Sequence, residues 1–244
     1  MREIVVTGGG TGIGHAVAAA FAAQGDRVTI TGRREHVLKE AADRLGGPDR
    51  VNYVTFNAAN PVAVGESLHR LPARVDVLVN NAGGNTNLDR APAEDDLMDV
   101  AESWWANLNA NLMSAVLVTT ALIPRLADHA RVVTIGSIAA RGTGSGSYGA
   151  AKAAVEAWTA DLAAELGPRG ITVNVVSPGL IVDTEFFRGR LTEEGIRRRV
   201  EGTRNGRAGT PEDVAETVRF VASPGARHIT GQIIHVNGGA YLGR

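Results

Sequence analysis

The chain has no cysteine, little aromatic content and almost no net charge. The absence of cysteine among its 244 residues excludes disulfides, thiolate nucleophiles and cysteine metal ligands, and it suits a reducing compartment such as the cytoplasm. A formal net charge of -1 lacks the basic excess that proteins built for nucleic acid or anionic membranes need. The six histidines show no ligand spacing. We therefore expect no nucleic-acid partner and no metal.

Long apolar runs are also missing. Residues 1–6 lead into a short apolar segment followed by turn residues, unlike a signal peptide with its longer apolar region and cleavage site. The most apolar long stretch, Asn111–Leu126, is interrupted by hydroxyl residues and by Pro124, and it is too short to span a membrane. The composition, 44% hydrophobic and 21% charged, is that of a globular protein. We expect one cytoplasmic domain over residues 1–244 that has no membrane partner.

Short runs rich in β-branched residues alternate with segments of helical length. Strands are expected at Ile4–Thr7, Val28–Thr31, Val51–Phe56, Val75–Val79, Val132–Ile135, Ile171–Val176 and Ile233–Val236. Helical segments between them include Gly14–Gln24, Glu35–Leu45 and Tyr148–Leu166. Continuous apolar strands that alternate with helices predict a parallel sheet covered on both faces. The predicted fold class is therefore α/β, a single doubly wound, Rossmann-type sheet of about seven mainly parallel strands.

One charged region departs from this alternation. The stretch Glu185–Arg207 contains seven arginines and precedes Thr210-Pro211-Glu212-Asp213, which is typical of a helix start. We expect a substrate loop or lid around residues 184–207. A solvated surface excursion is the alternative interpretation.

A glycine-rich loop directly follows the first predicted strand and precedes a helix. Glycines there let the backbone approach a diphosphate closely, and the helix N-terminus offers unpaired N–H groups and a positive dipole end. The spacing is GxxxGxG, a variant of the common GxGxxG pattern. The loop predicts a dinucleotide site with contacts from Gly8, Thr11, Gly12, Ile13 and Gly14.

The end of the second predicted strand indicates which dinucleotide binds. Folds of this kind usually place an acidic residue there against the ribose 2′-hydroxyl of NAD. This chain instead has Arg33 and Arg34 after Thr31-Gly32, which favours a 2′-phosphate and therefore NADP(H). Arg33 is the expected contact, whereas Arg34 is expected to be only solvated. Asn57, after the third strand, is expected near the adenine.

Tyr148 and Lys152 stand four residues apart, so on a helix their side chains share one face. A lysine charge about 6 Å away would favour the phenolate by roughly two pKa units at an effective dielectric of about 20. Tyr and Lys at this spacing are also common on solvated helix faces. The pair therefore predicts a proton donor only if other motifs support it.

Five motifs in order resemble the short-chain dehydrogenase/reductase family over essentially the whole chain. They are the glycine loop, Asn80-Asn81-Ala82-Gly83, Ser137, the Tyr148/Lys152 pair and Ser177-Pro178-Gly179. The segments Gly170–Val175 and Arg207–Ala215 are most similar to the 3-oxoacyl-[acyl-carrier-protein] reductase-like group. They are widely shared, so they do not name a substrate.

The resemblance implies a role for each catalytic residue. Tyr148 would be the general acid or base at the substrate oxygen, and Lys152 would lower the pKa of Tyr148 and hold the nicotinamide ribose. Ser137 would hydrogen-bond the substrate oxygen, and Asn111 would hold a water of the proton relay. Two hydroxyl donors suit the negative charge that hydride addition builds on a carbonyl oxygen.

The resemblance also implies further cofactor contacts. They would come from Asn81, Ala82, Gly83, Tyr148, Lys152, Pro178, Gly179, Ile181 and Thr184. The match is imperfect at Thr184, because the family usually has threonine one position earlier, where this chain has Asp183.

These features predict an NADP(H)-dependent oxidoreductase that interconverts a ketone and a secondary alcohol, with a 3-oxoacyl thioester as one candidate substrate. The alternatives are a dehydrogenase of a sugar, polyol or other small secondary alcohol, a non-catalytic NADP(H)-binding regulator, and a scaffold protein. Arg169 and the lid arginines could dock an acidic carrier protein, but Asp128-His129 counts against such docking.

The run Ile229–Gly239 resembles the family's last strand and subunit contact, so the implied assembly is a homotetramer. Trp158 is a candidate for a buried face of that assembly. Trp104 and Trp105 could anchor an interface, but we expect them to pack in the core.

Overall fold

The structure is a computed structural model that describes residues 1–89 and 96–243. Within this part of the chain a seven-stranded sheet has the order β3-β2-β1-β4-β5-β6-β7. The strands are β1 (Glu3–Thr7), β2 (Arg27–Gly32), β3 (Val51–Thr55), β4 (Val75–Asn80), β5 (Leu126–Ile135), β6 (Thr172–Pro178) and β7 (Ile233–Val236). Every neighbouring pair is parallel. The predicted α/β fold class is therefore confirmed.

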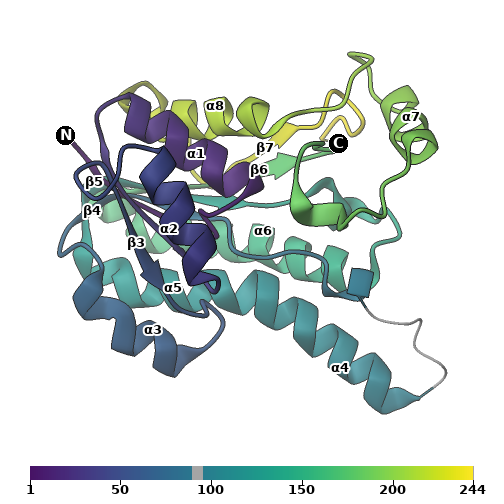
Figure 1. Cartoon of the computed structure of the whole chain (residues 1–244). Helices are drawn as coiled ribbons and strands as arrows, with labels where there is room; N and C mark the ends of the chain where they lie inside the picture. The colour runs from purple at the N-terminus through teal and green to yellow at the C-terminus, as the bar shows by residue number, and fades with distance from the viewer. Residues whose placement is uncertain (90–95, 244) are drawn as a thin grey trace.

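Helices cover both faces of the sheet (Figure 1). The longer helices are α1 (Gly12–Ala23), α2 (Glu35–Arg44), α3 (Pro61–Ser67), α4 (Leu97–Leu108), α5 (Ser114–Leu122), α6 (Gly146–Leu166), α7 (Glu193–Glu201) and α8 (Pro211–Val221). A π-helical segment, η3 (Asn109–Met113), joins α4 to α5. Short helical turns include η2 (Thr86–Asp89), η5 (Ile138–Arg141) and η7 (Glu185–Phe187).

Alternating strand residues feed two separate cores. Ile4 and Val6 of β1 pack into one core with side chains of α1, α2 and α8, whereas Val5 packs into the other core with α5 and α6. Side chains on a strand alternate between its two faces, so apolar residues at consecutive positions require cover on both sides. The continuous apolar runs in the sequence therefore encode a three-layer fold.

The predicted element boundaries were wrong by several residues in places. Helix α6 begins at Gly146, two residues before the predicted start, and β6 continues to Pro178. β5 begins at Leu126, well before the predicted Val132, and its pairing with β4 is irregular near Val75. Because the register shifts there, β5 includes polar residues that precede its apolar run.

The expected short apolar stretch is part of a longer helical run. Residues Leu97–Arg125 form 29 consecutive helical residues that are long and apolar enough to cross a membrane by length and composition. In α5, however, Ala115, Val118 and Leu122 are buried, and the last two pack with the strands in the second core. This burial is typical of a core helix in a folded α/β domain.

The tryptophans lie differently from the prediction. Trp104 and Trp105 on α4 are 44% and 56% exposed in the single chain, so the expectation that they pack in the core was wrong. Trp158 is partly buried against the second core.

The charged region Glu185–Arg207 forms η7 and α7 and then leads into α8 (Figure 1). None of the residues of α7 is buried. The start of α8 at Pro211, with Thr210 and Asp213 in a capping box, confirms the predicted helix start.

Candidate active site

The predicted motifs meet at one edge of the sheet. The strands are parallel, so their carboxyl ends lie on the same side, where open α/β sheets bind ligands. The glycine loop follows β1 and Asn81 follows β4, while Ser137 follows β5 and Gly179 follows β6. The topology therefore brings together segments that are far apart in the sequence.

The glycine loop is packed too closely to admit side chains. Gly8 and Gly12 have φ of 65° and 51°, in the left-handed region that favours glycine. A Cβ added at Gly14 would overlap the Gly8 carbonyl oxygen and the Asn81 side chain. The N-cap residue Thr11 makes no side-chain capping bond, so its hydroxyl is not used to close the start of α1. The loop thus presents backbone and the free N-terminus of α1 at this edge.

Asn81 joins the glycine loop to the end of β4. Its Nδ2 donates to the carbonyls of Thr7 and Gly8, both at 3.0 Å. The Thr7 hydroxyl in turn accepts from the backbone N–H of Asn81 and of Ala82, again at 3.0 Å. Asn81 and Ala82 therefore hold the segment after β4 against the start of the glycine loop.

Asn111 lies in η3, and its side chain holds the loop that follows Asn81. Its Oδ1 accepts from the Gly84 N–H at 3.0 Å, and its Nδ2 donates to the carbonyls of Gly84 and Asn107 at 2.9 and 3.0 Å. A Cβ on Gly83 would lie 2.6 Å from the same Oδ1. One Nδ2 hydrogen is used for this loop and the other for Asn107 on α4, so the role of Asn111 in holding a water stays a prediction.

Tyr148, Lys152 and Ser137 form a compact group. Tyr148 and Lys152 are buried on α6, and the Lys152 Nζ lies 5.9 Å from the centre of the Tyr148 ring. Nζ donates to the Ile135 carbonyl at 2.7 Å, and this carbonyl belongs to the end of β5, two residues before Ser137. The spacing predicted from the sequence therefore places a phenol, an amine and a hydroxyl together.

The pKa of Tyr148 moves in the direction opposite to the prediction. Burial raises it to about 12, and a hydrogen bond with Ser137 lowers it only in part. Burial also lowers the pKa of Lys152 to about 8. In a buried site the charged form of either group is disfavoured, and this desolvation is the largest cause of both shifts. The expectation that Lys152 brings Tyr148 toward neutral pH was therefore wrong for this structure.

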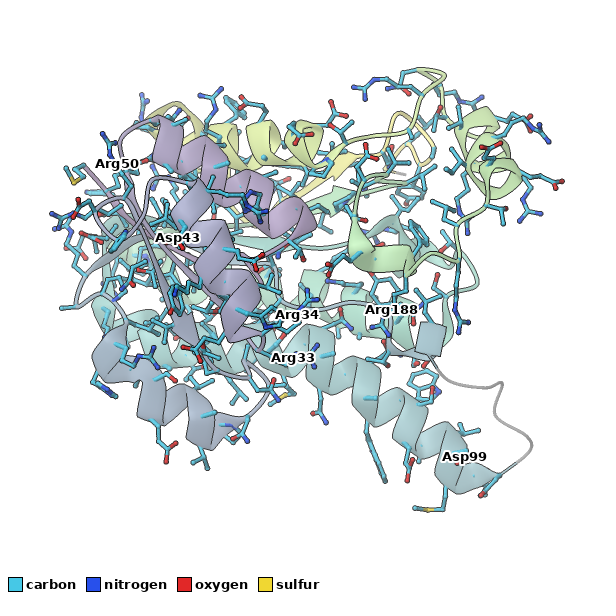
Figure 2. All side chains as sticks on the ribbon, in the orientation of Figure 1. Arg33, Arg34, Asp43, Arg50, Asp99 and Arg188 are labelled. Carbon is cyan, nitrogen blue, oxygen red and sulfur yellow. The ribbon has the colours of Figure 1, made fainter. Side chains whose placement is uncertain are left out.

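The arginines after β2 have different surroundings. Figure 2 shows Arg33 and Arg34 at the turn into α2. Both are exposed, and Arg34 forms an ion pair of 2.6 Å with Glu185, the first residue of η7. The expectation that Arg34 is only solvated was wrong, because its side chain joins this turn to η7. Asn57 lies exposed at the carboxyl end of β3, where its Oδ1 accepts from the Ala59 N–H at 3.1 Å.

The start of the predicted substrate loop packs against the glycine loop. A Cβ on Gly12 would lie 3.4 Å from the Thr184 side chain, so this part of the loop packs directly over the glycine loop. Two residues later, the Phe186 ring lies 5.7 Å from the Tyr148 ring. Asp183 and Arg188, on either side of this segment, have φ of 57° and 51° although neither is glycine. The segment Thr184–Phe187 thus connects the two ends of the site.

The turn after β6 is held by close packing and by a bridge to Gly209. A Cβ on Gly179 would lie 2.7 Å from the Asn237 Cβ, which explains why glycine follows Pro178 here. Ile181 bridges Gly209, and the two bridge bonds use the Val182 N–H and the Leu180 carbonyl. Neither of these bonds uses the Ile181 N–H.

Sequence reasoning missed a polar cluster beside Tyr148. The fully buried Asn107 donates to Asn87 Oδ1 and to Ser147 Oγ, both at 2.9 Å. Ser103 also donates to Asn87 Oδ1, at 2.8 Å. The cluster joins η2, α4 and the first turn of α6. An asparagine four residues before Asn111 was the available signal, since asparagine is uncommon inside helices.

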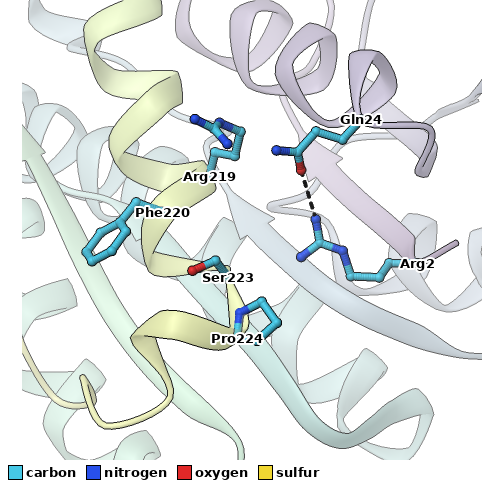
Figure 3. Close-up of a pocket in the computed structure, with 6 residues that line it drawn as sticks. All are labelled: Arg2, Gln24, Arg219, Phe220, Ser223 and Pro224. Carbon is cyan, nitrogen blue, oxygen red and sulfur yellow. Dashed lines mark hydrogen bonds between the residues drawn. The ribbon is translucent and has the colours of Figure 1, made fainter.

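Two cavities lie away from this group. One of about 300 Å³ is lined by Arg2, Gln24, Arg219, Phe220, Ser223 and Pro224, near the amino end of β1 (Figure 3). There Arg2 donates to Gln24 at 3.2 Å. The other, of about 310 Å³, lies between β7 and the start of α8. Neither is lined by Ser137, Tyr148 or Lys152.

Known proteins resemble the chain over nearly its whole length. The family model described as Enoyl-(Acyl carrier protein) reductase matches residues 8–241. The 3-oxoacyl-[acyl-carrier-protein] reductase FabG of Escherichia coli K12 is 36% identical, with 98% of this chain and 96% of the relative covered. The short-chain reductase protein NovJ of Streptomyces niveus is also 36% identical, with 96% and 92% covered.

Solved structures of short-chain dehydrogenases also resemble the chain over nearly its whole length. A short-chain dehydrogenase from Burkholderia cenocepacia in complex with NADP superposes with a TM-score of 0.86 at 34% identity, and 98% of this chain and 97% of that chain are covered. A glucose/ribitol dehydrogenase-type protein from Brucella melitensis gives 0.83 at 29% identity, with 99% and 97% covered. The chain belongs to the short-chain dehydrogenase/reductase family and is similar to its 3-oxoacyl-[acyl-carrier-protein] reductases.

Proposed function

We propose that the protein is an NADP(H)-dependent oxidoreductase that interconverts a ketone and a secondary alcohol. The observation on which this rests is the group formed by the buried Tyr148 and Lys152 and the partly buried Ser137, at the edge of the sheet that also carries the glycine loop. The NADP bound by the Burkholderia relative supports the choice of cofactor.

The residues present fit a dinucleotide phosphate. The positive φ of Gly8 and Gly12 and the crowding at Gly14 keep backbone N–H groups and the N-terminus of α1 accessible to a diphosphate. Arg33 would bind the 2′-phosphate, because its side chain is exposed directly after β2. NAD-binding folds usually have an acidic residue at this position, which would repel the phosphate. The remaining contacts would come from Thr11, Ile13, Asn57, Asn81, Ala82, Gly83, Tyr148, Lys152, Pro178, Gly179, Ile181 and Thr184. When bound, NADPH supplies the hydride for reduction.

Tyr148 and Ser137 act on the substrate oxygen. With a pKa of about 12, Tyr148 is protonated at neutral pH and can donate its proton to the alkoxide that forms there. The Ser137 hydroxyl supplies a second donor to the same developing charge. Lys152, with a pKa of about 8, is mostly charged at neutral pH and stabilises the phenolate left behind.

A 3-oxoacyl thioester is the substrate class that the name of the Escherichia coli relative favours. Docking through Arg169 is not supported, because this side chain donates to the Ile123 and Leu126 carbonyls and pairs with Asp128. The lid arginines remain candidates for an acidic partner. A small polyol or sugar alcohol is the second candidate class, favoured by the name of the Brucella relative. A homotetramer and a cytoplasmic location stay predictions.

NADPH oxidation followed by absorbance tests the proposal with a panel of ketones, including 3-oxoacyl thioesters. Tyr148→Phe removes the proton donor, so turnover should be nearly abolished while the Kd for NADPH changes only a few-fold. NADPH binding without turnover on any ketone would instead support a regulator. No dinucleotide affinity at all would support a scaffold.

Arg33→Ala tests the choice of cofactor. The exposed guanidinium should contact only the 2′-phosphate, so the variant should weaken NADPH binding far more than NADH binding in fluorescence titrations. Equal losses for both cofactors would contradict this assignment.

A further inference from the structure

An ion pair joins the turn of Ser137 to the helix of Tyr148 and Lys152. Arg141 is the last residue of η5, the turn that Ser137 caps, and Glu156 lies one helical turn beyond Lys152 on α6. The Arg141 guanidinium contacts Glu156 Oε2 at 2.5 Å, and the Glu156 side chain is only 5% exposed. Burial raises the pKa of Glu156, and Arg141 opposes this by favouring the carboxylate.

A second contact joins the same two elements beside Tyr148. A Cβ on Gly149 would lie 2.6 Å from the Ala139 carbonyl oxygen, so η5 packs directly against the first turn of α6. The Ser137 hydroxyl also accepts from the Ala139 N–H at 3.1 Å, which fixes the serine to this turn. The relative position of Ser137 and Tyr148 is thus set at two points, one near Tyr148 and one at the ion pair.

The C-terminal segment holds Arg141 from the other side. The Arg141 guanidinium lies over the Tyr241 ring, 5.8 Å from its centre. The Tyr241 ring is packed by the His235 ring at 5.0 Å, and its backbone carbonyl accepts from Asn237 Nδ2 at 3.1 Å. Arg141 is therefore fixed between α6 and the segment that follows β7.

We propose that Arg141 and Glu156 are positioning residues of the reaction, which hold the Ser137 hydroxyl in place against Tyr148. Neither residue contacts the reacting atoms. Their effect passes through the η5 turn, which the ion pair, the Gly149 contact and Tyr241 hold against α6. This inference rests on the proposed ketone reduction, because the serine and tyrosine must reach one substrate oxygen together.

The test separates positioning from simple stabilisation. Arg141→Leu leaves the buried Glu156 carboxylate without its partner, so it should lower the unfolding temperature as well as kcat. Glu156→Leu leaves only the partly exposed Arg141 unpaired, so it should lower kcat with a smaller loss of unfolding temperature. The double variant Arg141→Leu/Glu156→Leu removes both charges and should recover most of the unfolding temperature. Its kcat should stay about ten- to a hundredfold below that of the wild type, with an unchanged Kd for NADPH.

The exposed ion pair of Glu216 and Arg219 on α8 is the matched control. Its double leucine variant should change neither kcat nor the unfolding temperature appreciably. Recovery of both kcat and unfolding temperature in the Arg141/Glu156 double variant would overturn the proposal. If that variant does not fold, Glu156→Gln, which keeps the shape, decides by the same kcat criterion.

A readout without turnover keeps this inference distinct from the proposed function. The chain has three tyrosines, so ¹³Cζ labelling gives few resonances. Loss of the Ser137 hydrogen bond should shift the Tyr148 resonance in the double variant and leave that of Tyr53 unchanged. An unshifted Tyr148 resonance would overturn the positioning role even if no ketone were ever reduced.

Discussion

Lys152 should make stability and activity respond to alkaline pH in opposite directions. Burial lowers the pKa of Lys152 from 10.5 to about 8, a difference that corresponds to about 3 kcal/mol. The folded-state pKa lies below the unfolded value, so the penalty for the buried charge is present in full below pH 8. It is relieved as pH rises from about 8 to 10.5. The free energy of unfolding should therefore gain up to about 1.4 kcal/mol per pH unit in this window from Lys152.

Activity should fall over the same window. Above pH 8 Lys152 loses the charge that stabilises the phenolate, so kcat/KM for the ketone at saturating NADPH should decline with one apparent pKa. Tyr148, with a pKa of about 12, stays protonated there and does not cause the decline. Initial rates of NADPH oxidation between pH 6 and 10 measure this decline in kcat/KM.

Lys152→Met isolates the contribution of Lys152 to the pH dependence of the free energy of unfolding. Its free energy of unfolding, from urea titrations at several pH values between 7 and 10, should lack the alkaline rise that the wild type shows. The chain has one other lysine, Lys39, which is exposed on α2, and Lys39→Met should retain the rise. Identical slopes for wild type and Lys152→Met would refute the buried, poorly solvated ammonium on which the reasoning depends.

Three further substitutions test other parts of the site. Gly14→Ala adds a methyl group that overlaps the Gly8 carbonyl, so it should destabilise the fold by about 1–3 kcal/mol and weaken NADPH at least tenfold, as calorimetry can measure. Glu185→Gln frees Arg34 from its exposed ion pair and removes a negative charge near the phosphate, so NADPH affinity should rise by up to about fivefold at low salt while NADH affinity is unchanged. Asn107→Leu removes two hydrogen bonds of the polar cluster and leaves the Thr86 N–H without its acceptor, so it should lower the free energy of unfolding by about 1–3 kcal/mol in urea titrations.

The fold could be predicted from the sequence because its signals are local. Runs such as Val75–Val79 are apolar at every position, and in a sheet this pattern requires cover on both faces. The glycine loop, Asn81 and Ser137 each follow a strand directly, so the parallel topology alone brought them to one edge. For these residues the order along the chain and the alternation of elements were sufficient.

The remaining features depend on contacts between distant segments. Asn107 meets Ser147, which is 40 positions away, and Arg34 meets Glu185, which is 151 positions away. No spacing rule connects such residues. The exposure of Trp104 likewise depends on which face of α4 the rest of the chain covers, which the apolar composition of that helix does not specify.

The direction of the pKa shifts has a consequence for the direction of the reaction. At neutral pH the buried site holds Tyr148 as the neutral phenol and Lys152 mostly as the ammonium, since their pKa values are about 12 and 8. A phenol can donate to an alkoxide, which is the stronger base, whereas alcohol oxidation requires the phenolate that burial disfavours. Initial rates at pH 7 should therefore favour ketone reduction, and the ratio of oxidation to reduction should rise with pH. Because reduction consumes one proton, the overall equilibrium moves this ratio with pH whichever group delivers the proton. Tyr148→Phe therefore decides the assignment: both rates should be lost together, and a variant that kept either rate would show that Tyr148 is not the group that exchanges the proton.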